Sequence, residues 1–269
     1  MPWASPLDYL LEVAKFYLAL LAPWTVFTAL LYGWFYGWKR DQVAFRKLES
    51  ENPPRALEWS ALGQTQLTML AVALPNPFFD AFVPFDFYAT IGERGVLYYL
   101  GTLALGFFIF ESNFYWTHRL FHFPRFWRLH SPHHRYRLVT PLVRNANGFG
   151  EVLILTLCNL LIRLMPLHPS VPIIIILTGT AWNVLHHLGF EVLPLSWYRM
   201  GFHKVFVTST HHSMHHIEVN CHYGWIFAFW DRLCGTMHPT YEKRLEEVMT
   251  KIAVHKGVGV RTEPEKAAA

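Results

Sequence analysis

The longest uninterrupted apolar segment places the strongest constraint on how this chain folds. Residues 16–38 contain no charged side chain and end at Lys39 and Arg40. About 20 helical residues are enough to cross a hydrocarbon core of about 30 Å. Charged residues make up only 16% of the chain, compared with about 25% in an average soluble domain. We therefore predict a transmembrane helix here and a membrane location for the protein.

Further apolar segments predict more membrane helices. Residues 95–116 predict a second span. Residues 66–88 are interrupted by a Pro-Asn-Pro sequence, and they favour a kinked span over a re-entrant pair of half helices. Residues 152–165 and 171–185 are shorter and predict a helical hairpin that spans the bilayer or dips into it. The expected fold is an all-α, multi-pass transmembrane bundle of about four spans, or of spans plus a re-entrant hairpin.

The distribution of basic residues predicts the orientation of this bundle. Lysine and arginine gather in residues 39–65 and 117–150, which the positive-inside rule assigns to the cytoplasm. The net charge of +4 then reflects membrane topology, and we expect no nucleic-acid partner. Residues 187–269 would return to the same face and complete a cytosol-facing helical cap. The endoplasmic reticulum and a bacterial inner membrane are the expected locations.

Composition and patterning divide the chain into three expected regions. They are an N-terminal transmembrane region at residues 1–95, a histidine-rich region at residues 96–240, and a C-terminal region at residues 241–269. In the last region, residues 241–256 alternate charged and apolar side chains, which predicts a short amphipathic helix. The final residues are expected to be disordered.

Histidines are concentrated in one part of the chain and repeat at helical spacing. Fifteen of the 16 histidines lie between His118 and His238. Side chains at positions i, i+3 and i+4 share one helical face, and we expect each such cluster to aim its rings in one direction. A single pair is about as often structural as metal-binding, but three clusters on one membrane face indicate a metal site, because imidazole is a common metal ligand. The clusters are His118 and His122; His130, His133 and His134; and His212, His215 and His216.

The number of these histidines predicts two metal ions that lie close together. Eight imidazoles exceed the ligands of one tetrahedral or one octahedral ion. The three cysteines lack metal-binding spacing, and the chain has no HExxH motif of a zinc protease. Ligand chemistry alone leaves iron, zinc and copper open.

The clusters HRLFH, HSPHH and THHSMHH, together with WDRLCGT, resemble the histidine boxes of the fatty acid hydroxylase and sterol desaturase superfamily. The segments HSPHHRYRLVTP and HHLGFE resemble the sterol C5-desaturase-like branch. The resemblance covers about residues 100–240. One departure is His222, since the family usually has asparagine before the Tyr-Gly pair, and its role as an extra ligand or a simple substitution is left open.

The resemblance implies nine metal ligands, position by position. His187, in HHLGFE, joins the eight histidines of the three clusters. His186 and His211 lie beside ligands and are held in reserve, and His203 is a weaker candidate. The implied ligands are His118, His122, His130, His133, His134, His187, His212, His215 and His216.

The resemblance also implies an activity. A di-iron centre would use O2 to desaturate or hydroxylate a lipid C–H bond, with residues 96–240 as the catalytic domain and zinc as a possible substitute in purified protein. The substrate would be a sterol or an acyl chain, and a separate donor such as cytochrome b5 or ferredoxin would supply electrons. Alternatives are a fatty acyl or alkyl lipid hydroxylase and, from another class, a membrane metal transporter or metal-binding protein. Transport is disfavoured because the clusters lie beyond helix ends and no internal repeat is visible.

Three polar residues outside the histidine clusters also carry expectations. Glu111 lies two helical turns before His118, so we expect it either to accept a hydrogen bond from a ligand imidazole or, near a helix end, to face water. We expect Asp231 and Arg232 to form a structural pair.

Overall fold

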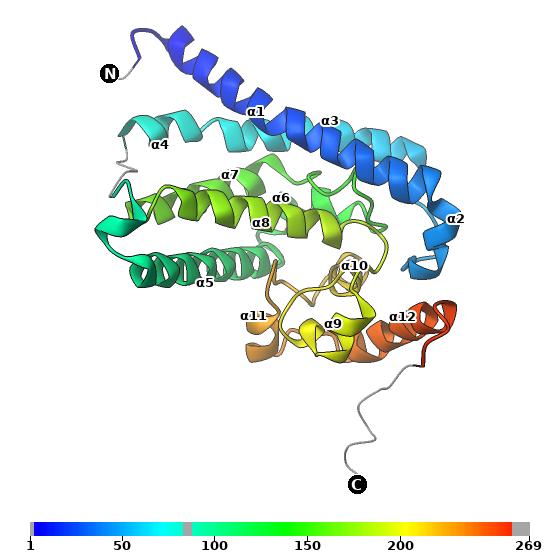
Figure 1. The fold of residues 1–269 in the computed structure, drawn as a ribbon. Helices are drawn as coiled ribbons and strands as arrows, with labels where there is room; N and C mark the ends of the chain where they lie inside the picture. Colours follow the sequence, from blue (N-terminus) through cyan, green and yellow to red (C-terminus); the bar gives the residue numbers. More distant parts are fainter. Residues whose placement is uncertain (1–2, 83–87, 260–269) are drawn as a thin grey trace.

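The computed structural model describes residues 3–82 and 88–259, and the regular structure of these residues is helical apart from two isolated bridges (Figure 1). The all-α prediction is confirmed for this part of the chain. Two helices in it, Pro6–Trp38 and Val96–Phe121, are long and apolar enough to cross a membrane. The expected disordered C-terminal end lies outside the described residues.

The first long helix, α1, begins ten residues before the predicted apolar segment. Ser5 caps it, because the Ser5 hydroxyl accepts from the Asp8 amide while the Asp8 carboxylate accepts from the Ser5 amide. Pro23 is accommodated within the helix. Nearly all of its side chains are at least partly exposed, as expected for apolar residues that face lipid. The N-terminal helices are α1 (Pro6–Tyr32), the π-helix Gly33–Trp38, α2 (Arg40–Val43), the 3-10 helix Ala44–Arg46, α3 (Arg55–Ala73) and α4 (Asn76–Phe82).

The helices α3 and α4 run antiparallel to α1 along its length. The Tyr32 hydroxyl donates to Glu58 near one end, and the Tyr9 hydroxyl donates to the Leu74 carbonyl near the other. The chain turns at Leu74 and Pro75, between the two helices. The predicted interruption is therefore present, although the helix begins earlier than expected, at Arg55, and the last residues of the predicted segment are partly outside the described ranges.

The middle of the chain forms a helical layer around α5 (Figure 1). Both α7 and α8 pack against α5, and they are joined by the 3-10 helix Leu161–Leu164, in agreement with the predicted pair of short apolar helices. Gly106 of α5 lies so close to α8 that an added Cβ would meet Ile175 at 2.8 Å. The elements are α5 (Val96–Phe121), α6 (Trp127–His134), α7 (Phe149–Leu160) and α8 (Ser170–His186).

The C-terminal segments pack beside the ends of α5 and α8. The helix α10 contacts both α8 and α12. The predicted amphipathic helix is present as α12, which buries Leu245, Met249 and Ile252 in a cluster with Met214 of α10. The elements are α9 (Leu195–Arg199), the 3-10 helix Phe202–Lys204, α10 (Ser209–Glu218), α11 (Phe229–Leu233) and α12 (Tyr241–His255).

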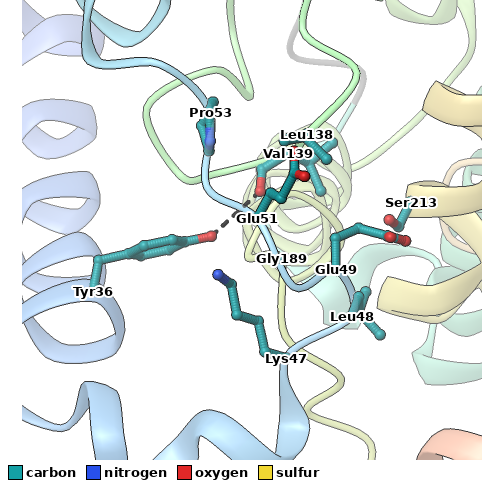
Figure 2. A pocket seen from close by; sticks show the side chains of 10 residues that line it. All are labelled: Tyr36, Lys47, Leu48, Glu49, Glu51, Pro53, Leu138, Val139, Gly189 and Ser213. Carbon is teal, nitrogen blue, oxygen red and sulfur yellow. Dashed lines mark hydrogen bonds between the residues drawn. The ribbon is translucent and has the colours of Figure 1, made fainter.

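The end of the first long helix meets the segment that follows α8. The Tyr36 hydroxyl donates to the Leu188 carbonyl at 2.9 Å and lies 3.3 Å from the Val139 carbonyl oxygen, the contact drawn in Figure 2. An added Cβ at Gly189 would lie 2.7 Å from the Val139 carbonyl oxygen, so only glycine fits there. A small pocket beside this contact also reaches Ser213 of α10.

Candidate metal centre

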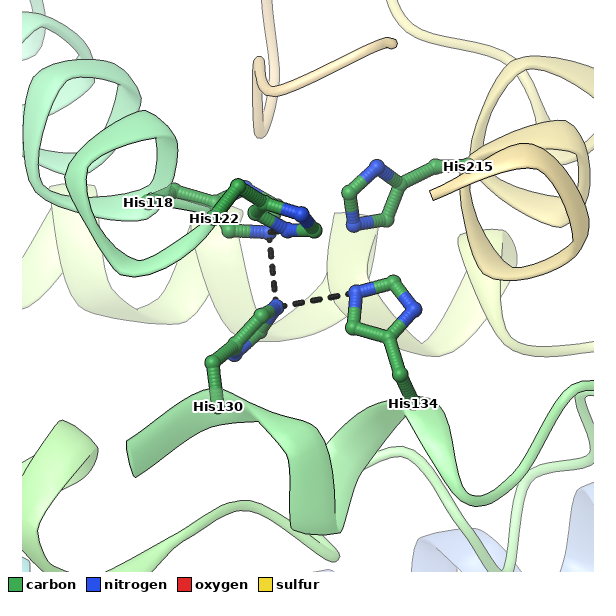
Figure 3. A group of neighbouring side chains, drawn as sticks. All are labelled: His118, His122, His130, His134 and His215. Atoms are coloured by element: carbon green, nitrogen blue, oxygen red, sulfur yellow. Dashed lines mark hydrogen bonds between the residues drawn. The ribbon is translucent and has the colours of Figure 1, made fainter. Parts of the chain in front are cut away.

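All nine histidines of the expected ligand set gather in two neighbouring groups. Within each group the candidate ligand nitrogens lie within 4.8 Å of one another. The groups adjoin, because the rings of His134 and His216 have centroids 5.1 Å apart. The five-histidine group, shown in Figure 3, contains His118, His122, His130, His134 and His215. The four-histidine group contains His133, His187, His212 and His216.

Each histidine triplet divides between the two groups. On α6, His130 and His134 join the five-histidine group, whereas His133 joins the other. The expectation that each triplet aims in one direction is therefore wrong. The physical reason is helical geometry: at 100° per residue, position i+4 lies 40° to one side of i and position i+3 lies 60° to the other. On α10 the same rule separates His215 from the pair His212 and His216.

The remaining ligand candidates come from the ends of the two central helices. His118 lies in the last turn of α5, and His122 is the C-cap residue of that helix. His187 is the C-cap residue of α8. The helices α5 and α8 therefore each place a ligand candidate at the point where the apolar sequence of the helix ends.

Hydrogen bonds at the outer ring nitrogens leave lone pairs that face each other. His118 Nδ1 donates to the Tyr223 carbonyl at 3.0 Å, so the Nε2 of the neutral ring carries a lone pair. His130 Nδ1 lies 2.8 Å from a Glu151 carboxylate oxygen, which favours a proton on that nitrogen too. The two Nε2 atoms are only 3.1 Å apart. Two lone pairs cannot form a hydrogen bond with each other, and a cation between them removes their repulsion.

The same arrangement recurs at two more histidines. His215 Nδ1 donates to the Cys221 carbonyl at 2.6 Å, and His187 Nδ1 donates to the Asn183 carbonyl at 3.0 Å. The Nε2 of His187 lies 3.0 Å from that of His212. Metal–nitrogen bonds of about 2.0–2.1 Å place adjacent ligands roughly 3.0–3.4 Å apart. The donor atoms thus fit metal ions.

Burial disfavours the charged form of ligand candidates that lie outside the apolar helices. Burial lowers the pKa of His133 to about 3 and that of His122 to about 2. Burial also lowers the pKa of His216 well below its ordinary value. Neutral imidazole is the form that binds metals, so these rings need no deprotonation before they bind.

Glu151 is the functional candidate that sequence reasoning missed. It lies in the first turn of α7, is 4% exposed, and contacts His130 while also accepting a hydrogen bond from the Gly148 amide. A carboxylate at the outer nitrogen of a metal-ligating histidine orients the ring and raises its basicity. The one signal in the sequence is an acidic residue at the start of an apolar segment.

The reserve histidines lie outside both groups. His222 uses both ring nitrogens structurally, because Nδ1 donates to the His211 carbonyl and Nε2 accepts from the His238 amide. Its ring stacks on that of His211, with centroids 3.9 Å apart. His186 contacts the Val207 carbonyl, and His203 pairs with Glu242 on α12.

Two expectations about acidic residues are wrong. Glu111 accepts hydrogen bonds from backbone amides and, within residues 3–82 and 88–259, from no histidine, because a distant loop folds over its side chain. Asp231 is fully buried and also binds backbone amides. Arg232 instead pairs with Glu242, since neighbouring residues on a helix point in directions about 100° apart.

Comparisons with known proteins match this site. The family model for fatty acid hydroxylases matches residues 103–236, a range that contains all nine histidines. The Delta(7)-sterol 5(6)-desaturase of Candida glabrata is 28% identical over 48% of this chain and 34% of its own length. The C-4 methylsterol oxidase of Schizosaccharomyces pombe is 26% identical over 82% of this chain and 72% of its own length. A cholesterol 25-hydroxylase-like protein of Danio rerio is 28% identical over 54% of this chain and 58% of its own length.

The chain therefore spans between a third and three quarters of the length of these relatives. No solved structure matches it. From the family match, the relatives and the two histidine groups, we conclude that this chain belongs to the fatty acid hydroxylase and sterol desaturase superfamily.

Proposed function

We propose that this protein is a membrane-bound, O2-dependent oxidase that desaturates or hydroxylates a C–H bond of a lipid. The observation that carries the proposal is the pair of adjoining histidine groups within the segment that the family model matches. Because the relatives act on sterols by name, we propose a sterol-type lipid as the substrate class. Because one relative is named as hydroxylase-like, we propose hydroxylation as well as desaturation as a possible reaction of this protein.

We propose that each histidine group holds one iron ion, with all nine histidines as ligands. Bound iron supplies the one-electron and O2 chemistry that amino acid side chains lack. The protein's own residues hold the site in place. Buried rings exclude water, and Tyr223, Cys221, Glu151 and Asn183 fix the outer nitrogens of four of them. Rigid ligands of this kind are what a reactive centre requires.

We also propose that the protein is multi-pass and that the site faces the cytoplasm. The supporting observation is the contact between Tyr36 and Leu188. It brings the end of the first long helix, which Lys39 and Arg40 follow, next to His187. Basic residues at a helix end mark the cytoplasmic side, so the histidine groups would lie there. In this topology residues 1–95 anchor the protein in the membrane and residues 96–240 form the catalytic domain. Residues 241–269 complete the cytosol-facing helical cap.

Electrons would come from a separate protein, with cytochrome b5 or a ferredoxin as the class of donor. Metal transport is the rival function from another class. Transporters hold ions near the bilayer midplane between repeated halves, whereas these histidines lie at the ends of α5 and α8. The oxidase is therefore the function that the geometry supports best.

The test uses detergent-purified protein loaded with iron and supplied with a chemical or enzymatic reductant. Sterols and fatty acyl lipids are offered separately, and O2 uptake is measured together with product mass. We expect a product that is two mass units lighter or sixteen heavier, and no product from a His215→Ala variant. Equal product from the two proteins would contradict the proposal.

A further inference from the structure

The loop between α10 and α11 supports only one of the two histidine groups. This site loop comprises residues 219–227. Its Tyr223 carbonyl accepts from His118 and its Cys221 carbonyl accepts from His215, and both histidines belong to the five-histidine group. Within the described residues, the hydrogen bonds of the four-histidine group lead to Asn183, to one another and, from His133, to the backbone of Ala146, which lies outside the site loop.

Two buried carboxylates hold four consecutive amides of the site loop. The Tyr223 and Gly224 amides donate to Asp231, each at 2.8 Å. The Trp225 and Ile226 amides donate to Glu111 at 2.8 and 3.0 Å. Glu111 lies on α5, seven residues before His118, and Asp231 lies on α11. The loop is thus fixed to the helix that carries one of the ligands it orients.

The loop is held in a backbone shape that it would not adopt alone. Val219 and His222 have φ angles of 64° and 61°, a region that residues other than glycine rarely occupy. A Cβ on Gly224 would lie 2.6 Å from the Phe227 carbonyl oxygen and 2.9 Å from an Asp231 oxygen. Such strain persists only where surrounding contacts impose it. The two carboxylates hold the amides that directly follow His222, and the His222 amide donates to the Thr236 carbonyl at 2.9 Å.

We propose that Glu111 and Asp231 are positioning residues that act on the five-histidine group through the site loop. By accepting the four amides they hold the Tyr223 and Cys221 carbonyls, which in turn fix the protonated nitrogen and ring orientation of His118 and His215. Their removal weakens metal binding at that group alone. This inference rests on the proposed function, because it takes the histidines to be metal ligands.

An amide in place of either carboxylate disrupts this arrangement without changing its volume. In a Glu111→Gln variant one oxygen still accepts an amide, but the new NH2 group faces the second backbone N–H and cannot accept from it. The peptide must turn away, and its carbonyls move with it. Outer-sphere changes of this kind typically reduce metal affinity about 10–100-fold.

The experiment measures metal affinity by competition with a chelator in two backgrounds of the full-length protein. His187→Ala removes a ligand of the four-histidine group, so the remaining ion reports on the five-histidine group. His134→Ala does the reverse. Glu111→Gln and Asp231→Asn are added to each background, and Glu58→Gln serves as the control, because Glu58 is also buried but binds Tyr32 and Thr140 instead of the site loop.

We expect Glu111→Gln to weaken metal binding about 10–100-fold in the His187→Ala background and less than about threefold in the His134→Ala background. Asp231→Asn should weaken metal binding in the same way. If one of the two variants fails to fold, the other still tests the inference. Equal weakening in both backgrounds, or weakening matched by Glu58→Gln, would show a general effect on folding and overturn the inference. If the wild-type protein binds no metal, the proposed function fails and the inference with it.

Discussion

The two histidine groups share two helices but differ in what holds their rings. Both take ligands from α6 and α10. In the five-histidine group the outer nitrogens reach Glu151 on α7 and the carbonyls of Cys221 and Tyr223 in the site loop. In the four-histidine group, the corresponding bond of His187 reaches Asn183, one turn earlier on the same helix. The five-histidine group is thus held by the site loop and α7, whereas the four-histidine group is held by its own helix α8 and by a backbone hydrogen bond between His133 and Ala146.

One sequence motif can therefore contribute to two sites whose rings have different outer contacts. Each i, i+3, i+4 triplet contributes to both groups, so the motif does not determine how firmly either is held. Ring orientation depends on outer hydrogen bonds. We therefore expect the five-histidine group to keep its ion more tightly, and the following predictions test that contrast.

The largest effect is expected from removing one ligand of either group. His122→Ala and His187→Ala should each lower product formation by more than about a hundredfold, because loss of a metal ligand costs more than the 10–100-fold of an outer-sphere change. Product mass per enzyme is the measurement. Full activity in one of the two variants would exclude its group from the reaction and contradict the proposal that both groups hold a metal ion needed for activity.

The next effect is expected at Glu151. A Glu151→Gln variant should weaken metal binding at the five-histidine group about 10–100-fold and leave the other group unchanged, since the carboxylate contacts only His130 among the ligand candidates. Chelator competition in the two single-ligand backgrounds measures it. A Glu58→Gln variant provides the control, and weakening of both groups would refute the assignment.

Metal release from the unaltered protein should show the contrast directly. Excess chelator should remove the two ions in two phases, with the four-histidine group about tenfold faster because fewer distant contacts hold its rings. The fast phase should disappear in a His187→Ala variant. Loss of the slow phase in that variant would reverse the proposed order of the two groups.

A smaller effect is expected at His222, where the family usually has asparagine. His222→Asn should keep both ions, because both ring nitrogens already bind backbone groups. Loss of one buried hydrogen bond should lower the free energy of unfolding by about 1–2 kcal/mol. Metal analysis and denaturant unfolding in detergent measure the two quantities, and loss of an ion would make His222 a ligand.

The smallest effect is expected at His203, which belongs to neither histidine group and pairs with Glu242. The hydrogen bond from His203, with a second from Arg232, holds the pKa of Glu242 below its ordinary value. A lowered carboxylate pKa adds stability above the unfolded-state pKa, and that stability is lost as pH falls through the folded-state value. His203→Ala should therefore cost less than about 1 kcal/mol near neutrality and less still in acid. A constant cost across pH would contradict this pairing.

Sequence periodicity predicted the helical fold well, since the long apolar segments correspond to α1 and α5 and the shorter ones to α7 and α8. Helix ends were less predictable. The helix α1 begins at its Ser5 cap, before the apolar run, because capping and not hydrophobicity determines where a helix starts.

The gathering of the nine histidines was also predictable, because their spacing and the family resemblance identify them, while their role as metal ligands stays a prediction. Their division into groups was not, since it depends on how α6 and α10 face each other across the site. Glu151 was missed, and Glu111 was given the wrong partner, for a related reason. Which groups a buried carboxylate contacts depends on loops that approach from distant parts of the chain.

The most direct test of two independent metal sites is the metal content of the purified protein, with iron and zinc counted together per chain. We predict two ions in the unaltered protein, one in His134→Ala, one in His187→Ala and none in the double variant. A single ion in the unaltered protein, or loss of both ions in either single variant, would contradict the account.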